Sequence, residues 1–123
     1  MTPYANTAYA QPIAPTRTLR AAEYDVIARV TQRLVAADAD RIPNKAAFLE
    51  ALHLNERLWS TLAADVADQG NGLPQALRAR LVYLYRFTVE HSRKIREGSA
   101  SAGVLVDINT AILRGLRGEG HTP

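Results

Sequence analysis

The chain has 123 residues, a formal net charge of +3 and no cysteine. This length fits one domain, and a hydrophobic content of 47% is enough to build one core. Without cysteine there can be no disulfide, no thiolate metal site and no cysteine nucleophile. This agrees with a reducing compartment, and we expect the protein in the cytoplasm.

Residues 1–16 are rich in Tyr, Pro and Ala and show no helical or strand period. Because few of these residues could anchor the segment, we predict a flexible N-terminal tail. It has neither the early basic residues nor the long apolar run of a secretory signal. No apolar stretch of the sequence approaches the roughly 18–20 residues that span a bilayer, so we predict no membrane insertion.

Helical periodicity predicts a bundle domain over residues 17–118. Its first helix covers about residues 18–37 and begins after Pro15. The second covers about residues 43–68, because Pro43 suits the first turn of a helix.

A Gly70-Asn71-Gly72 break ends the second helix, and a third covers about residues 74–97. Since the connection is short, we expect these two helices to pack antiparallel. Gly98 ends the third helix, a fourth reaches about Leu116, and residues 119–123 form a frayed end. No run alternates in the hairpin pattern, so the predicted fold is a small all-α bundle of about four helices.

Apolar residues at helical spacing identify the candidate core. On the third helix the apolar surface extends round most of the girth, which is typical of a helix that is central in its bundle or covered by a partner. The residues that we expect in the core are Leu52, Trp59, Leu62, Leu81, Leu84, Ile108 and Ile112.

Asn55 and Asn109 lie on two of these apolar stripes. A buried amide without partners costs roughly 1–3 kcal/mol, so we expect the two to pair with each other or with free backbone carbonyls. Such a pair would fix the helix register. The alternative is that one of them opens into a groove and reads the backbone of a partner.

The order of several short motifs carries a family resemblance. Asn55-Glu56-Arg57-Leu58-Trp59-Ser60 is followed by the Gly70-Asn71-Gly72 break, by Leu73-Pro74-Gln75-Ala76-Leu77-Arg78-Ala79 and by Asp107-Ile108-Asn109. Over about residues 18–116 this order resembles the FlaF family of flagellar biosynthesis regulators. The resemblance implies an all-helical cytoplasmic protein that acts on flagellin production and export, with no known chemistry.

The third helix carries the candidate partner surface. Adjacent aromatic side chains beside arginine are typical of interface anchors, although a fourth helix that covers them is an equally simple alternative. The residues that we expect to contact a partner are Tyr83, Phe87, Val82, Val89, Arg86 and Arg93.

Nothing in the sequence predicts an enzyme or a cofactor. The two histidines outside the C-terminal end, His53 and His91, do not have the spacing of metal ligands. A catalytic acid such as Glu23 would need a second titrating group nearby, and the spacing joins neither histidine to it. Gly70-Asn71-Gly72 lacks the Lys-Ser/Thr of a phosphate loop. We therefore expect no catalytic residue, no metal and no cofactor.

These observations leave three functional hypotheses open. By its resemblance to the FlaF family, the chain would promote flagellin synthesis or secretion by a chaperone-like contact with flagellin or with a companion regulator such as FlbT. Alternatively, the arginines of the third helix would bind flagellin message, which makes the protein a post-transcriptional regulator that contacts RNA. Third, the extra apolar surface would be a homodimer interface.

Overall fold

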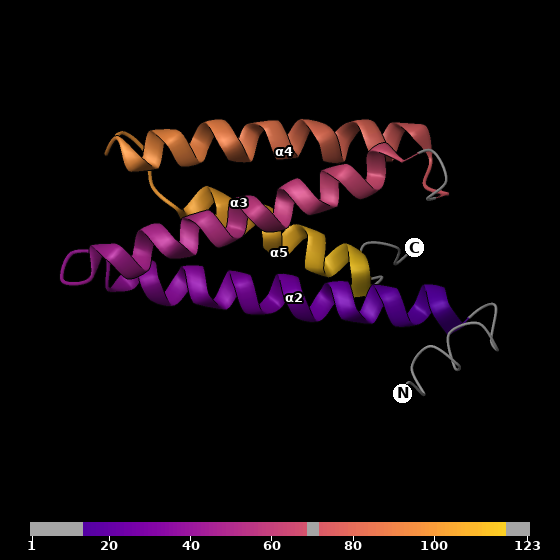
Figure 1. Ribbon diagram of the computed structural model, residues 1–123, viewed down its shortest axis with the longest axis horizontal. Coiled ribbons are helices and arrows are strands. Elements are labelled where there is room, and N and C mark those ends of the chain that lie inside the picture. Colours follow the sequence, from indigo (N-terminus) through magenta and orange to yellow (C-terminus); the bar gives the residue numbers. More distant parts are fainter. Residues whose placement is uncertain (1–13, 69–71, 118–123) are drawn as a thin grey trace.

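The computed structural model describes residues 14–68 and 72–117 of the chain (Figure 1). Among these residues it contains helices and no strand, as the sequence predicts. The helices are α2 (Ala14–Ala39), α3 (Lys45–Ala67), α4 (Gln75–Arg96) and α5 (Gly103–Arg117). The protein is therefore an all-α bundle.

Helix α3 lies between α2 and α4 and packs against both (Figure 1). Helix α5 packs mainly against α2. In Figure 1, α5 starts close to the end of α4 and finishes close to α2, far from the beginning of α4. Helix α4 is therefore an outer helix, and its first half has only α3 as a close neighbour.

Two local motifs fix the helix ends. The side chain of Asn44 caps α3 by accepting a hydrogen bond from the backbone N–H of Ala47 at 3.2 Å. At the end of α4, Gly98 has φ of +85° and donates to the carbonyl of Ile95, while Ser99 donates to the carbonyl of Lys94. These two bonds form a Schellman motif, which turns the chain sharply toward α5.

The core lies at one end of the bundle, where α2 ends, α3 begins, α4 ends and α5 begins. Every helix contributes to it, and a fully buried leucine contributes about 1.5–3 kcal/mol. The buried residues of this cluster are Leu34, Phe48, Ala51, Leu52, Ile95, Ala102 and Leu105.

The sequence-based core differs from this one in a systematic way. Leu52 and Trp59 are buried, at 0% and 1% exposure. Five other predicted core residues are only half-buried: Leu62, Leu81, Leu84, Ile108 and Ile112. For Leu81 and Leu84 the physical reason is that α5 runs from the end of α4 toward α2, so the first half of α4 has only α3 as a close neighbour (Figure 1).

Two helix boundaries also differ from the prediction. Helix α2 begins at Ala14, before the expected start near Thr18, and α3 begins at Lys45, so that Pro43 precedes the capping residue Asn44 instead of lying in the first turn. Of the tail predicted over residues 1–16, residues 14–16 are helical and the rest lie outside the described residues, as does the frayed end predicted over residues 119–123. None of the described helices has the length and apolar character needed to cross a membrane.

Candidate functional site

A buried cluster of polar side chains connects α2, α3 and α5. We call Thr31, Asn55, Trp59 and Asn109 the Asn109 cluster. Nδ2 of Asn109, on α5, donates to Oδ1 of Asn55 at 2.8 Å and to Oγ1 of Thr31 at 3.0 Å. The indole Nε1 of Trp59 donates to Oδ1 of Asn109 at 2.9 Å. The amide of Asn109 therefore uses both its ends to connect α5 with α2 and α3.

Every member of the Asn109 cluster is shielded from solvent, with exposures between 0% and 6%. The hydroxyl of Thr31 donates a hydrogen bond to the carbonyl oxygen of Ile27 at 2.6 Å, so that it donates and accepts at once. Nδ2 of Asn55 has no hydrogen-bond partner among the described residues. Because buried polar groups are costly unless paired, the cluster favours one relative placement of α2, α3 and α5.

The pairing of Asn55 with Asn109 that the sequence predicts is present in the structure. Neither amide opens to the surface, since both have 0% exposure. The sequence interpretation overlooked Thr31. The signal was available, because Thr31 sits between Ile27 and Leu34 at i+4 and i+7 on the apolar stripe of α2.

The predicted partner-contact residues all lie on α4, but they divide between two adjacent faces. Val82, Arg86, Val89 and Arg93 recur at i, i+4, i+7 and i+11 and share one face. Tyr83 is rotated from Val82 by about 100° about the helix axis, and Phe87 follows it one turn later. The predicted set therefore forms two neighbouring surfaces on one helix.

The face of α4 that contains Tyr83 and Phe87 is linked through His91 to the connection between α4 and α5. Phe87 is half-buried and stacks on His91, with ring centroids 5.2 Å apart and an interplanar angle of 16°. Nε2 of His91 lies 3.0 Å from the carbonyl oxygen of Ser101. Tyr83 is 65% exposed. The alternative that the fourth helix covers both aromatic residues completely is therefore wrong for Tyr83.

The other face of α4 carries two valines between arginines. Val89 is 39% exposed and Val82 is half-buried. Arg86 is exposed and forms no ion pair with any described residue. Its charge is therefore not neutralised within the described part of the molecule.

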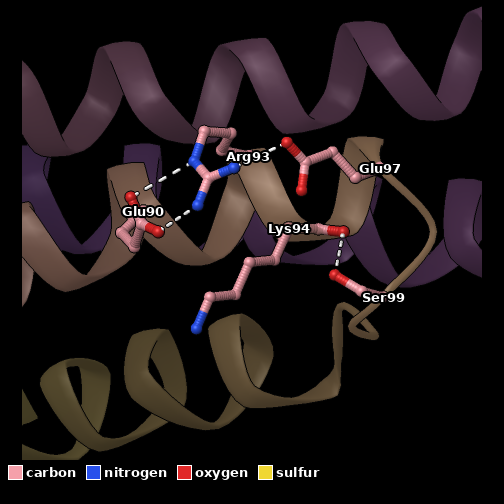
Figure 2. Close-up of polar contacts among 5 residues, drawn as sticks. All are labelled: Glu90, Arg93, Lys94, Glu97 and Ser99. Carbon is pink, nitrogen blue, oxygen red and sulfur yellow. Dashed lines mark hydrogen bonds and ion pairs between the residues drawn. The ribbon is translucent and has the colours of Figure 1, made fainter.

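Arg93 differs from Arg86, because it is hydrogen-bonded to the carboxylates of Glu90 and Glu97 near the end of α4 (Figure 2). Its guanidinium donates to both oxygens of Glu90 and to Oε2 of Glu97, the latter at 2.6 Å. The hydrogen bond from Arg93 lowers the pKa of Glu90, and the same carboxylate raises the pKa of Arg93. Arg96 likewise pairs with Glu56 across to α3. The charges of Arg93 and Arg96 are therefore paired with carboxylates of the same chain.

The first half of α4 is apolar and yet contains no buried side chain. From residue 75 to residue 87, every residue is exposed or half-buried. The large apolar residues in this range are Leu77, Leu81, Val82, Tyr83, Leu84, Tyr85 and Phe87. The second half of α4 contrasts with it, because Thr88, Ser92 and Ile95 are buried against the bundle.

The described residues contain no group of three or more His, Asp or Glu side chains placed to hold a metal ion. His91 contacts Phe87 and the Ser101 carbonyl oxygen, and His53 is exposed.

Comparison with known families places the molecule. The sequence model of the family described as "Flagellar protein FlaF" matches residues 5–116. The chain belongs to the FlaF family. The match spans the Asn109 cluster and all of α4, and it identifies this FlaF-family member as a flagellar protein. Neither the curated proteins nor the solved structures gave a match.

Proposed function

We propose that this FlaF-family protein is a non-enzymatic regulator of flagellar biosynthesis that promotes flagellin synthesis or secretion in the cytoplasm. It would act by a chaperone-like contact with flagellin, or with a companion regulator of the FlbT kind. Family membership supports the flagellar role. The contact itself is supported by the first half of α4, which carries large apolar side chains without burying one of them.

The physical argument for a contact surface rests on exposed apolar area. Partly exposed Val82, Tyr83 and Val89 on one helix offer anchors for a second amphipathic helix. Covering such a helix in a partner would keep its apolar stripe from aggregating before export. Only α3 covers the first half of α4 (Figure 1). Packing within the chain therefore does not account for so wide an apolar surface on this helix.

A second candidate is a regulator that binds flagellin message. Arg78, Arg80 and Arg86 form no ion pair with a described residue, and Tyr83 lies among them. Basic and aromatic side chains together suit single-stranded RNA. We rank this candidate second, since the exposed leucine and valine side chains gain little from contact with RNA.

The experiment is co-purification of the tagged chain from flagellated cells after nuclease treatment. Recovered flagellin or an FlbT-like regulator supports the first function. Loss of every partner on nuclease treatment supports RNA binding, and a lone homodimer contradicts both.

Two variants make this experiment specific to α4. Val82→Asp combined with Val89→Asp is expected to abolish capture of the partner while the far-UV circular dichroism stays helical. The matched control is Ile42→Asp, because Ile42 is an apolar residue with 86% exposure in the turn between α2 and α3. Capture that survives the double substitution contradicts a contact through α4.

A further inference from the structure

The face of α4 that contains Val82 also contains arginines, and their pattern is regular. Arg78, Val82, Arg86 and Val89 occupy positions i, i+4, i+8 and i+11, which places them on one side of the helix. We call these residues the arginine–valine stripe. It presents apolar and cationic groups in alternation along the outer helix of the bundle.

Arg78 shows that the stripe lacks an acceptor. Nε of Arg78 is buried and has no hydrogen-bond partner among the described residues. Its guanidinium also forms no ion pair with them, in contrast to Arg93 and Arg96. The charges of Arg78 and Arg86 are therefore both unpaired among the described residues, and carboxylate is the acceptor that matches the fork geometry of a guanidinium.

We propose that the arginine–valine stripe binds an amphipathic helix of another protein whose apolar side is flanked by carboxylates. Leucine-like side chains of that helix would cover Val82 and Val89, and its carboxylates would accept from Arg78 and Arg86. This inference rests on the proposed function, and it names the chemistry of the partner that the α4 contact requires.

Charge argues against a second copy of the chain as the occupant. Packing the stripe on itself about a twofold axis would bring two cationic surfaces together, and the stripe contains no carboxylate that could pair with the arginines in any register. RNA would satisfy the arginines but would leave the valines against polar sugar and phosphate. An amphipathic helix with flanking carboxylates would cover the valines and pair with the arginines.

The test uses the full chain and two synthetic helical peptides, measured by isothermal titration calorimetry at low and at physiological salt. Both peptides carry leucine at i, i+3, i+4 and i+7, and they differ in having glutamate or lysine beside the leucines. We expect the glutamate peptide to bind at least about tenfold more tightly than the lysine peptide. Glutamate would attract Arg78 and Arg86, whereas lysine at the same positions would repel them. Equal affinity for the two peptides overturns the proposal.

Variants assign the binding to the stripe. Arg78→Glu with Arg86→Glu is expected to reduce affinity for the glutamate peptide about tenfold or more. The matched control is Arg80→Glu with Lys94→Glu, which makes the same charge change on the opposite side of α4 and is expected to change affinity by less than about twofold. Arg86→Glu alone, at an exposed position, gives the same direction of change if the double variant unfolds.

The outcomes separate this inference from the proposed function. If the wild-type chain captures a flagellar partner and Arg86→Glu captures it equally well, the acidic-helix inference falls and the proposed function stands. If the glutamate peptide binds through the arginines but no flagellar partner is recovered, the inference stands and the function falls. Binding of an oligoribonucleotide with a steep salt dependence, and of neither peptide, overturns the inference in favour of RNA.

Discussion

The indole Nε1 of Trp59 donates a 2.9 Å hydrogen bond to Oδ1 of Asn109, a residue 50 positions later in the chain and on another helix. Asn109 also donates to Asn55 and to Thr31. One amide on α5 therefore satisfies polar groups on both of the helices that it touches, and removing it leaves several buried groups without partners.

Asn109→Leu is expected to lower the free energy of unfolding by about 2–4 kcal/mol, because it leaves the N–H of Trp59 buried and unpaired. Chemical denaturation followed by circular dichroism measures this. Asp107→Leu, at an exposed position of the same helix, is the control and is expected to change stability by less than about 0.5 kcal/mol. Unchanged or increased stability of Asn109→Leu would sink the assignment of Asn109 as a register residue.

The direct pair is tested by a double-mutant cycle with Asn55→Ala and Asn109→Ala. We expect a coupling free energy of about 0.5–3 kcal/mol, since the two side chains share a buried hydrogen bond. Strictly additive effects would show that the 2.8 Å contact contributes nothing of its own.

Two buried threonines are predicted to respond differently to the same substitution. Thr31→Val removes a hydroxyl that both donates and accepts, and it is expected to destabilise the protein by about 1–2 kcal/mol. Oγ1 of Thr88 has no hydrogen-bond partner among the described residues, so Thr88→Val is expected to be neutral or to stabilise by up to about 1 kcal/mol. Thermal unfolding of the two variants side by side gives the comparison, and a loss at Thr88 as large as at Thr31 would contradict it.

Gly98→Ala is expected to destabilise the protein by about 1–2 kcal/mol, because residue 98 has φ of +85° and a Cβ is strained there. Space is not the cause, since a Cβ at residue 98 would meet nothing within 4 Å. Gly103 is the matched control. A Cβ there also has open space, its φ lies outside the positive range, and Gly103→Ala is expected to be neutral or mildly stabilising. Equal effects at the two positions would refute the backbone explanation.

The ion pairs of Arg93 predict a pH effect on the acid side. Because the hydrogen bond from Arg93 lowers the pKa of Glu90 below its ordinary 4.5, the unfolded chain takes up this proton more readily than the folded chain. The pair therefore contributes its stability in full above the ordinary pKa of glutamate, and the contribution disappears as the pH falls through the lowered pKa. A carboxyl-detected NMR titration should show the lowered pKa of Glu90 in the wild type and its return toward 4.5 in Arg93→Gln. A titration that is the same in both would exclude Arg93 as the cause.

Sequence alone predicted the helices, and it included the Asn55–Asn109 contact as one of two ways to pair the buried amides, the other being free backbone carbonyls. Both predictions follow from a period of 3.6 residues and from the cost of burying an amide. The sequence did not predict where α4 lies. The wide apolar surface of α4 fits a central helix as well as an outer one, and the choice depends on α5 packing against α2 rather than α4. For the same reason periodicity placed Leu81 and Leu84 on the correct side of α4 but overestimated their burial, because it identifies a face and not the neighbour that covers it.

The division of the predicted contact residues between two faces was within reach of the sequence, since helical rotation follows from residue numbers. The occupation of Arg93 by Glu90 and Glu97 was also readable from spacings of three and four residues. The unpaired Nε of Arg78 was not, because it depends on tertiary burial of a single atom.

The reach of Asn109 back to Thr31, across 78 positions, also sets an order of events while the chain is being made. Helix α5 leaves the ribosome after α2, α3 and α4 have all been synthesised. Until it docks, the indole of Trp59 and the hydroxyl of Thr31 must exchange hydrogen bonds with water. Nascent chains that stop before residue 103 are therefore expected to stay open at the centre, and the native bundle closes only once translation has passed Asn109.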